Sequence, residues 1–212
     1  MGYRIEHYIV GPIATNCYFL INDETKEAVV VDPGAAAKPL SGKLDEGGYT
    51  PVAILLTHGH FDHADAVDDL LAIYSDREIP VYAYSGEKET LEDPRINLSG
   101  DMNRSPKVYH ATDYLNDGEE FTVAGFTVRT IFTPGHTPGG CCFYLEKEGV
   151  CFTGDTLFCG SVGRSDFPGG SASTLVRSIR EKLLVLPDDT VCYPGHDSVT
   201  TIADEKKYNP FL

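Results

Sequence analysis

Basic residues are scarce in this 212-residue sequence. Seventeen Lys and Arg stand against 32 Asp and Glu, which gives a formal net charge of −15 at pH 7. A nucleic-acid backbone is held mainly by Lys and Arg, and a surface this acidic repels it on average. We therefore expect no nucleic-acid partner and interpret the acidity as a means of keeping the protein in solution.

Long apolar runs and export signals are missing too. No stretch approaches the roughly 20 apolar residues of a membrane span, and the N-terminus lacks the apolar core and cleavage site of a signal peptide. The six cysteines form no C-x-x-C pair. Without an export signal, such cysteines are typical of reduced core residues rather than disulfides. We expect a cytoplasmic protein without a membrane partner, either a monomer or a homodimer.

The length and composition indicate an ordinary globular protein. A hydrophobic content of 42% and a charged content of 23% are usual for such a chain, and its length suits one well-buried domain spanning residues 1–212. No G-x-S-x-G motif occurs, so the sequence offers no exposed nucleophilic serine of that kind.

Three histidines and an aspartate lie within six residues directly after an apolar run. The run 52–56 reads as a buried strand, and His58, His60, Asp62 and His63 follow it. Side chains two positions apart share a face of an extended segment, so His58 and His60 point the same way. Neutral imidazole and carboxylate are ligands for zinc or iron, so the cluster indicates a metal site.

Four further metal-capable side chains follow other apolar stretches, each beside Gly or Pro. The stretch 126–132 leads to His136, 149–153 to Asp155, 189–192 to His196, and 28–31 to Asp32. Each alone is explained by a turn with a polar residue. Together with the cluster after residue 56, they favour a metal site at the carboxyl ends of several strands.

With these residues in order, the chain resembles the metallo-β-lactamase-fold hydrolases. Asp32, His58-x-His60-x-Asp62-His63, His136, Asp155 and His196 match that family's five motifs. The resemblance implies two divalent metal ions per chain, zinc first and iron or manganese as alternatives. It assigns one ion to His58, His60 and His136, and the other to Asp62, His63 and His196. Asp155 would bridge the ions, and Asp32 would accept a hydrogen bond from a ligand. A carboxylate at 155 instead of a cysteine disfavours antibiotic hydrolysis.

The predicted elements agree with a layered α/β fold. We expect strands at 4–10, 17–22, 28–31, 52–56, 81–84, 120–123, 126–132, 142–145 and 150–153, and helices at 35–46, 65–74 and 174–184. Many short strands in two sets flanked by helices suggest two sheets packed face to face with helices outside. The resemblance sharpens this to the αββα sandwich, with the metal site at one edge between the sheets.

The expected reaction is hydrolysis of a thioester. Two divalent ions can lower the pKa of a shared water towards 7 and polarise a carbonyl, and Asp62 and Asp155 would orient the attacking hydroxide. A thiolate leaves readily without a strong general acid. Within the superfamily the tract 154–170 and the ending 209–212 resemble glyoxalase II-like hydrolases, which implies S-lactoylglutathione or a related acyl thioester as substrate. Arg164 matches a lysine that contacts glutathione there, so it is the candidate substrate anchor.

Departures from glyoxalase II keep other readings open. Asp166 and Ser198 stand where that enzyme has tyrosines, and its helical C-terminal domain is missing. The alternative is a persulfide dioxygenase with one iron held by positions matching His58, His136 and Asp155, because the tract 163–167 resembles that family equally well. An intact set of seven ligands argues against a non-catalytic scaffold. His7 and His110 are interpreted as structural.

Overall fold

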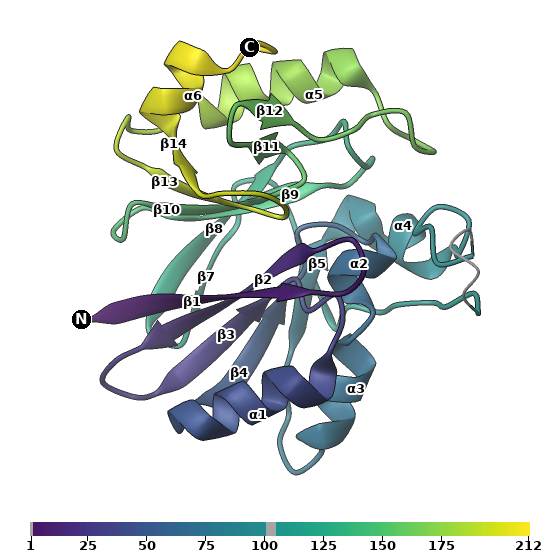
Figure 1. Ribbon diagram of the computed structural model, residues 1–212, viewed down its shortest axis with the longest axis vertical. Helices are drawn as coiled ribbons and strands as arrows, with labels where there is room; N and C mark the ends of the chain where they lie inside the picture. Colours follow the sequence, from purple (N-terminus) through teal and green to yellow (C-terminus); the bar gives the residue numbers. More distant parts are fainter. Residues whose placement is uncertain (1, 101–104) are drawn as a thin grey trace.

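Two six-stranded sheets dominate the structure, a computed structural model that describes residues 2–100 and 105–212 (Figure 1). The first sheet has the order β1-β2-β3-β4-β5-β6 and the second β14-β13-β10-β9-β8-β7. The strands of the first sheet are β1 Tyr3–Val10, β2 Thr15–Asn22, β3 Glu27–Val31, β4 Thr50–Leu55, β5 Val81–Tyr84 and β6 Asp113–Leu115. Those of the second are β7 Glu120–Val123, β8 Phe126–Phe132, β9 Cys141–Leu145, β10 Val150–Gly154, β13 Val191–Pro194 and β14 Thr200–Thr201; β11 Leu157–Phe158 and β12 Ser161–Val162 form a separate ribbon.

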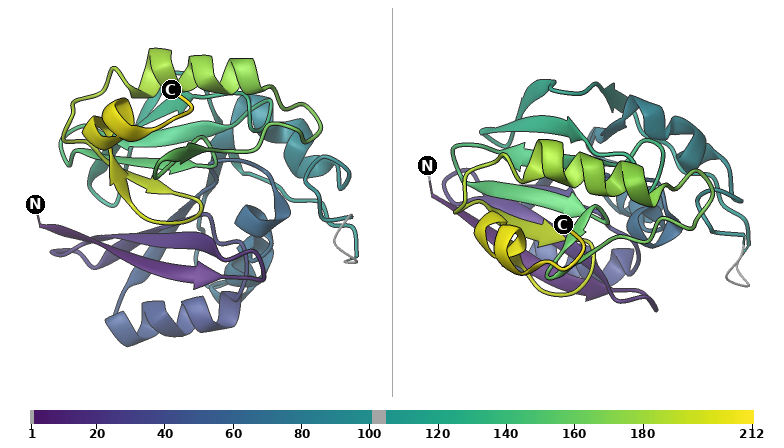
Figure 2. Two further views of the ribbon diagram at one scale, coloured as in Figure 1. Left: turned by 45° about the horizontal axis from the view of Figure 1, so that its top comes forward. Right: turned by 90° about the horizontal axis from the view of Figure 1, so that it is seen from above.

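Helices cover the outer face of each sheet. Helices α1 and α3 lie on the first sheet, while α5 and α6 lie on the second (Figures 1 and 2). The helices are α1 Ala37–Gly47, α2 Phe61–Ala64, α3 Val67–Ile73, the 3₁₀ turn η1 Ser85–Glu87, α4 Lys88–Glu92, α5 Ala172–Ser178, the π-helical turn η2 Ile179–Leu183 and α6 Ile202–Tyr208. The predicted αββα layering is confirmed. Across residues 2–100 and 105–212, no helix combines the length and apolarity needed to traverse a lipid bilayer.

Strand β2 shows why the sheets are covered on both faces. Every residue of β2 is buried. Phe19 and Ile21 pack in the cluster under α1 and α3, whereas Tyr18 and Leu20 pack in the cluster between the sheets. Because successive side chains of a strand point to opposite faces, such a run must be covered on both sides. A third cluster, which contains Leu175, joins the second sheet to its own helices.

Strand direction gathers the expected site residues at one edge. β3 and β4 run parallel, as do β10 and β13. β8 is antiparallel to β9, which is antiparallel to β10, so β8 runs in the direction of β10. The segments that follow β3 and β4 thus leave the first sheet at one end, and those that follow β8, β10 and β13 leave the second sheet at one end. These two ends adjoin, because Nδ1 of His60 after β4 lies 2.9 Å from Nε2 of His136 after β8. All metal-capable residues of the sequence pattern lie in those segments.

The predicted helix 65–74 was wrong at its start. Helix α2 already begins at Phe61, and the chain then turns at 65–66 before α3 begins at Val67. Asp62 and His63 thus belong to the first helical turn rather than to a loop before it. The predicted helix 174–184 begins earlier, at Ala172, where the Ser171 hydroxyl accepts a hydrogen bond from the backbone N–H of Thr174, and its second half is π-helical. Strands β6, β11, β12 and β14 and helices α4 and α6 were not predicted.

The backbone that follows β3 approaches the ligand segment so closely at Gly34 that no side chain fits. A Cβ atom on Gly34 would lie 1.3 Å from the carbonyl oxygen of Asp62. We expect Gly34→Ala to lower the free energy of unfolding by about 3 kcal/mol, the upper range for overpacking, as measured by urea denaturation. Gly42→Ala is the control, because nothing lies within 4 Å of a Cβ there and alanine favours a helix interior. Equal stability of the two variants would contradict this reading.

Candidate metal centre

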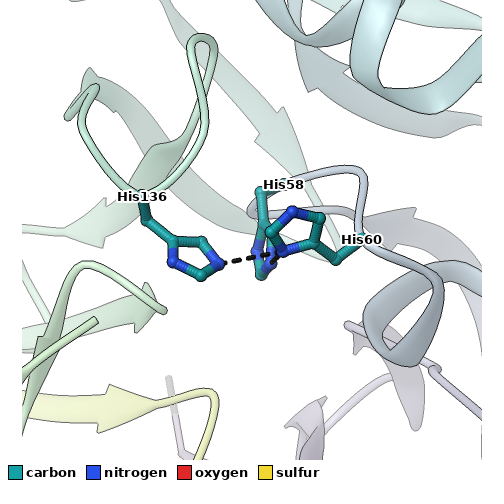
Figure 3. Close-up of side chains that lie close together, drawn as sticks. All are labelled: His58, His60 and His136. Carbon is teal, nitrogen blue, oxygen red and sulfur yellow. Dashed lines mark hydrogen bonds between the residues drawn. The ribbon is translucent and has the colours of Figure 1, made fainter. Parts of the chain in front are cut away.

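Three imidazoles converge at the edge between the sheets (Figure 3). His58 and His60 follow β4, and His136 follows β8. The Nδ1 atom of His60 lies 3.1 Å from Nε2 of His58 and 2.9 Å from Nε2 of His136. Nitrogens bound to one tetrahedral zinc at about 2.0–2.1 Å are about 3.3 Å apart. The spacing of these three nitrogens is therefore close to that of a three-histidine metal site.

Neighbouring hydrogen bonds fix which nitrogens carry protons. The Thr57 hydroxyl donates to Asp32 Oδ2 (2.7 Å), so it can only accept from His58 Nδ1, 3.2 Å away. His136 Nδ1 donates to the carbonyl oxygen of Arg164 (2.6 Å). The Nε2 atoms of neutral His58 and His136 thus present lone pairs to His60. One N–H on His60 could satisfy only one of them, so a cation completes this arrangement better than any hydrogen-bond pattern.

A second group of donors lies beside the first. Oδ2 of Asp62 is 3.5 Å from Nε2 of His63 and 3.4 Å from Nε2 of His196. Asp62 and His63 come from α2, and His196 follows β13. Nε2 of His63 is buried without a hydrogen-bond partner among the described residues, whereas its Nδ1 faces the Asp32 carboxylate. Buried polar atoms are nearly always satisfied, so Nε2 of His63 also fits a bound cation.

Asp155 lies between the two groups. Its Oδ1 is 3.4 Å from Nε2 of His63, and its Oδ2 is 3.5 Å from Nε2 of both His136 and His196. Oδ1 has no hydrogen-bond partner within the described part of the chain. The carboxylate of Asp155 therefore faces ligands of both groups.

Burial and neighbouring charges keep His58, His60 and Asp155 in their metal-binding forms, whereas the carboxylates around His63 raise the pKa of that histidine. Burial, reinforced by the neighbouring imidazoles, holds the pKa of His58 well below its ordinary value, and burial lowers the pKa of His60 to about 3. Burial alone would raise the pKa of Asp155, but His63 and the other imidazoles lower it to about 2. At neutral pH His58 and His60 are therefore neutral and Asp155 is ionised, which are the states that bind a metal.

Asp32 contacts His63 of the second group and Thr57, which precedes the first group. Its Oδ1 accepts a hydrogen bond from the backbone N–H of Thr57 (2.8 Å), and its Oδ2 lies 3.0 Å from Nδ1 of His63. Through Thr57 it also orients His58. Asp32 adopts a φ of 50°, in the left-handed region that aspartate tolerates better than most residues. Asp32 therefore contacts His63 directly and reaches His58 only through Thr57.

The β1–β2 hairpin contributes residues that the sequence analysis missed. The Thr15 hydroxyl donates to Asp62 Oδ2 (2.8 Å). The Asn16 side chain donates to the carbonyl oxygens of Pro194 and Asp197, on either side of His196. His7, expected to be structural, lies with Nε2 2.6 Å from Asn16 Oδ1. The only sign of these contacts in the sequence was that two polar residues, Thr15 and Asn16, begin the otherwise largely apolar strand β2.

Glu87 is a second missed residue. It is 1% exposed, and its Oε1 accepts a hydrogen bond from the backbone N–H of Gly59, between two ligand histidines (2.8 Å). Burial raises the pKa of Glu87 to about 7. A buried glutamate with one carboxylate oxygen on the ligand segment holds that segment in place. His110, by contrast, is exposed and lies 3.7 Å from Glu92, in keeping with its expected lack of a site role.

A cavity of about 500 Å³ opens onto the donors. Arg164 lines it, as a substrate anchor would require, but its guanidinium donates to both carboxylate oxygens of Asp166 (3.0 and 2.8 Å) and lies 4.4 Å from the ring centre of Phe167. The cysteines are all free, as predicted, and all but Cys159 are buried. The residues lining the cavity are Ile13, His60, Phe61, Asp62, Leu98, His136, Asp155, Phe158, Arg164, Phe167, Pro168 and His196.

The chain belongs to the Metallo-beta-lactamase superfamily, whose family model matches residues 10–196. It is 41% identical to "Probable metallo-hydrolase YqgX" of Bacillus subtilis, over 96% of this chain and 94% of that protein. It is 37% identical to "Hydroxyacylglutathione hydrolase GloC" of Haemophilus influenzae, over 99% and 98%. The protein is thus a metallo-hydrolase of this fold, and its His/Asp cluster is the metal-binding site.

Solved structures agree on the fold. The BLEG-1 B3 metallo-beta-lactamase superposes with a TM-score of 0.92 at 43% identity, over 99% of both chains. TTHA1623 in a di-iron-bound form gives 0.85 at 34% identity, over 98% of this chain and 100% of that one. ETHE1 from Myxococcus xanthus gives 0.75 at 28% identity, over 99% and 84%.

Replacing Asp32 tests the support of the metal centre. Asp32→Asn removes the negative charge beside His63 and one acceptor for Thr57, so we expect metal affinity to fall about 10- to 100-fold, the usual effect of losing a partner of a ligand. Competition with a chromogenic chelator measures it. Asp188→Asn, which breaks an exposed ion pair with Lys206, serves as the control. Unchanged affinity in Asp32→Asn would show that the ligands are held without it.

Proposed function

We propose that the protein hydrolyses acyl thioesters, with two divalent ions held at the site, one by His58, His60 and His136 and the other by Asp62, His63 and His196. The observation that carries this proposal is that Asp155 faces both groups of donors on the floor of one cavity. The di-iron form of TTHA1623 supports the use of two ions. Zinc is the first candidate for this donor set, with iron and manganese as alternatives.

Water is the nucleophile in this proposal. Among the described residues that line the cavity, none is a serine, threonine, cysteine or lysine, so no hydroxyl, thiol or amine side chain there serves as the nucleophile. Bound divalent ions supply two things, a lowered pKa for water and polarisation of the scissile carbonyl. Asp62 and Asp155, both ionised, accept hydrogen bonds from that water and aim its lone pair at the carbonyl carbon.

Thioesters fit the site because the leaving group needs little help. The pKa of Asp62 and Asp155 is held below its ordinary value by the surrounding imidazoles, although burial opposes this. Neither carboxyl therefore serves as a general acid at neutral pH. A thiolate leaves without protonation more readily than an alkoxide or an amide nitrogen. GloC, similar to this chain over nearly its whole length, is named as a hydrolase of such a bond.

Removing His63 tests the two-ion assignment. We expect the purified protein to contain about two equivalents of zinc, iron or manganese per chain, and His63→Ala to contain about one. Thioester hydrolysis should fall at least about 100-fold, because even a ligand's partner is worth 10- to 100-fold. Elemental analysis and a thiol-release assay measure the two effects. His110→Ala, which alters an exposed histidine, is the control, and unchanged turnover in His63→Ala would favour a single-ion mechanism.

A persulfide dioxygenase is the second candidate, supported by the likeness to ETHE1. In that reading His58, His136 and Asp155 hold one iron, and two histidines with a carboxylate suit iron–oxygen chemistry. His136 Nε2 and Asp155 Oδ2 are 3.5 Å apart, so the geometry supports this ligand set as well. One iron per chain together with oxygen uptake on glutathione persulfide would replace the thioesterase proposal.

β-Lactam hydrolysis is a further activity to compare, because BLEG-1 is named as a metallo-beta-lactamase. The carboxylate at position 155 distinguishes this chain from the zinc β-lactamases with a thiolate ligand. An amide nitrogen is also a poorer leaving group than a thiolate. We therefore expect hydrolysis of a chromogenic cephalosporin to be slower than that of a thioester at equal enzyme concentration.

A further inference from the structure

The wall of the cavity differs in chemistry from its floor. Five of its lining residues belong to the donor cluster. Apart from these, every described lining residue except Arg164 is apolar: Ile13, Phe61, Leu98, Phe158, Phe167 and Pro168. Leu98 adopts a φ of 64°, a conformation that is a genuine outlier for a bulky side chain and that gathers at functional sites. Outside the cluster and Arg164, the described wall offers a substrate no side chain that can form a hydrogen bond.

Two aromatic rings flank the donors on different sides. The ring of Phe167 packs edge-on against His60 and His136, with centroids 5.3 and 5.9 Å away. The ring of Phe158 packs edge-on against His196, at 5.9 Å. One ring therefore adjoins the three-histidine group and the other adjoins the second group. A carbonyl placed at the donors has an apolar surface on both sides, one for the acyl chain and one for the thiol.

Arg164, the one cation among the described residues of the wall, is paired with a carboxylate of its own loop. The backbone of Arg164 is fixed by its hydrogen bond from His136, while its guanidinium is paired with Asp166 and lies over Phe167. Asp166 is as exposed as Arg164, at 68% each, so its charge opposes that of the cation that lines the cavity. An anionic group that enters meets both charges together.

We propose that the substrate is an uncharged thioester with apolar groups on both the acyl and the thiol side, and that Asp166 enforces this choice by cancelling the charge of Arg164. The proposal rests on the thioesterase function proposed above and narrows it. A glutathione thioester carries two carboxylates, an ammonium and two amides, each of which loses free energy when it is removed from water without a partner. Apolar substituents instead gain from leaving water against the rings of Phe158 and Phe167.

A matched pair of probes separates the two classes. The two thioethers S-hexyl-N-acetylcysteamine and S-hexylglutathione share the hexyl group, cannot be hydrolysed, and differ in the charge of the thiol part. Isothermal titration of the metal-loaded protein should give a Kd at least about tenfold lower for the uncharged probe. In Asp166→Asn the ratio of the two Kd values should narrow about fivefold, which is the effect of one unit charge a few ångström away in water.

Controls and a turnover assay make the outcomes distinct. Asp76→Asn removes an exposed carboxylate paired with Arg77 and should leave the ratio of Kd values as it is. Tighter binding of S-hexylglutathione, no saturable binding of the uncharged probe, or an unchanged ratio in Asp166→Asn would each overturn the proposal. The hexanoyl thioesters of the same two thiols test the underlying function. If neither thioester is hydrolysed, the thioesterase proposal fails. The ratio of the Kd values of the two thioethers still shows whether the cavity prefers the uncharged probe.

Discussion

The carboxylate of Asp155 lies among imidazoles that come from both sheets, and the rest of the site is arranged around it. His63 reaches it from the first sheet's side, and His136 and His196 reach it from the second. Burying ionised carboxylates and imidazole lone pairs costs free energy that their mutual contacts only partly offset. Cations at the two donor groups would relieve that cost, so metal binding and the stability of this edge are coupled.

The free energy that stabilises the fold comes from regions outside the site. Three apolar clusters, one between the sheets and one under each helical layer, supply the burial that holds the two sheets together. None of them depends on the donors. Loops at the edge can therefore adopt conformations that serve the site alone, such as the left-handed backbone of Asp32 and the close approach of Gly34 to Asp62. A rigid double sheet with functional loops at one edge is a common solution to this conflict.

Chemistry and selectivity are divided between the floor and the wall of the cavity. The floor consists of ligands, so its composition is tied to the metal. The wall comes from separate segments: the β1–β2 turn supplies Ile13, the segment after α4 supplies Leu98, and the loop before α5 supplies Phe167. The wall nevertheless contacts the floor, because Phe167 packs against the rings of His60 and His136. A change in the wall can therefore alter selectivity and also shift the ligands.

Local pattern in the sequence was enough to predict the donor residues and most strands. His58, His136, Asp155 and His196 each follow an apolar run, and the strands β5, β7 and β8 have the bounds expected from such runs. The local pattern could not predict contacts between residues far apart in the sequence. Thr15 contacts Asp62 at a separation of 47 residues, Asn16 contacts Pro194 at 178 residues, and Glu87 contacts Gly59 at 28 residues. The residues alone determined which side chains could bind a metal. Only the tertiary structure decided which of these side chains meet, which of their atoms face one another and what lines the cavity next to them. The reason is that hydrophobic periodicity records burial but carries no information about partners distant in the chain.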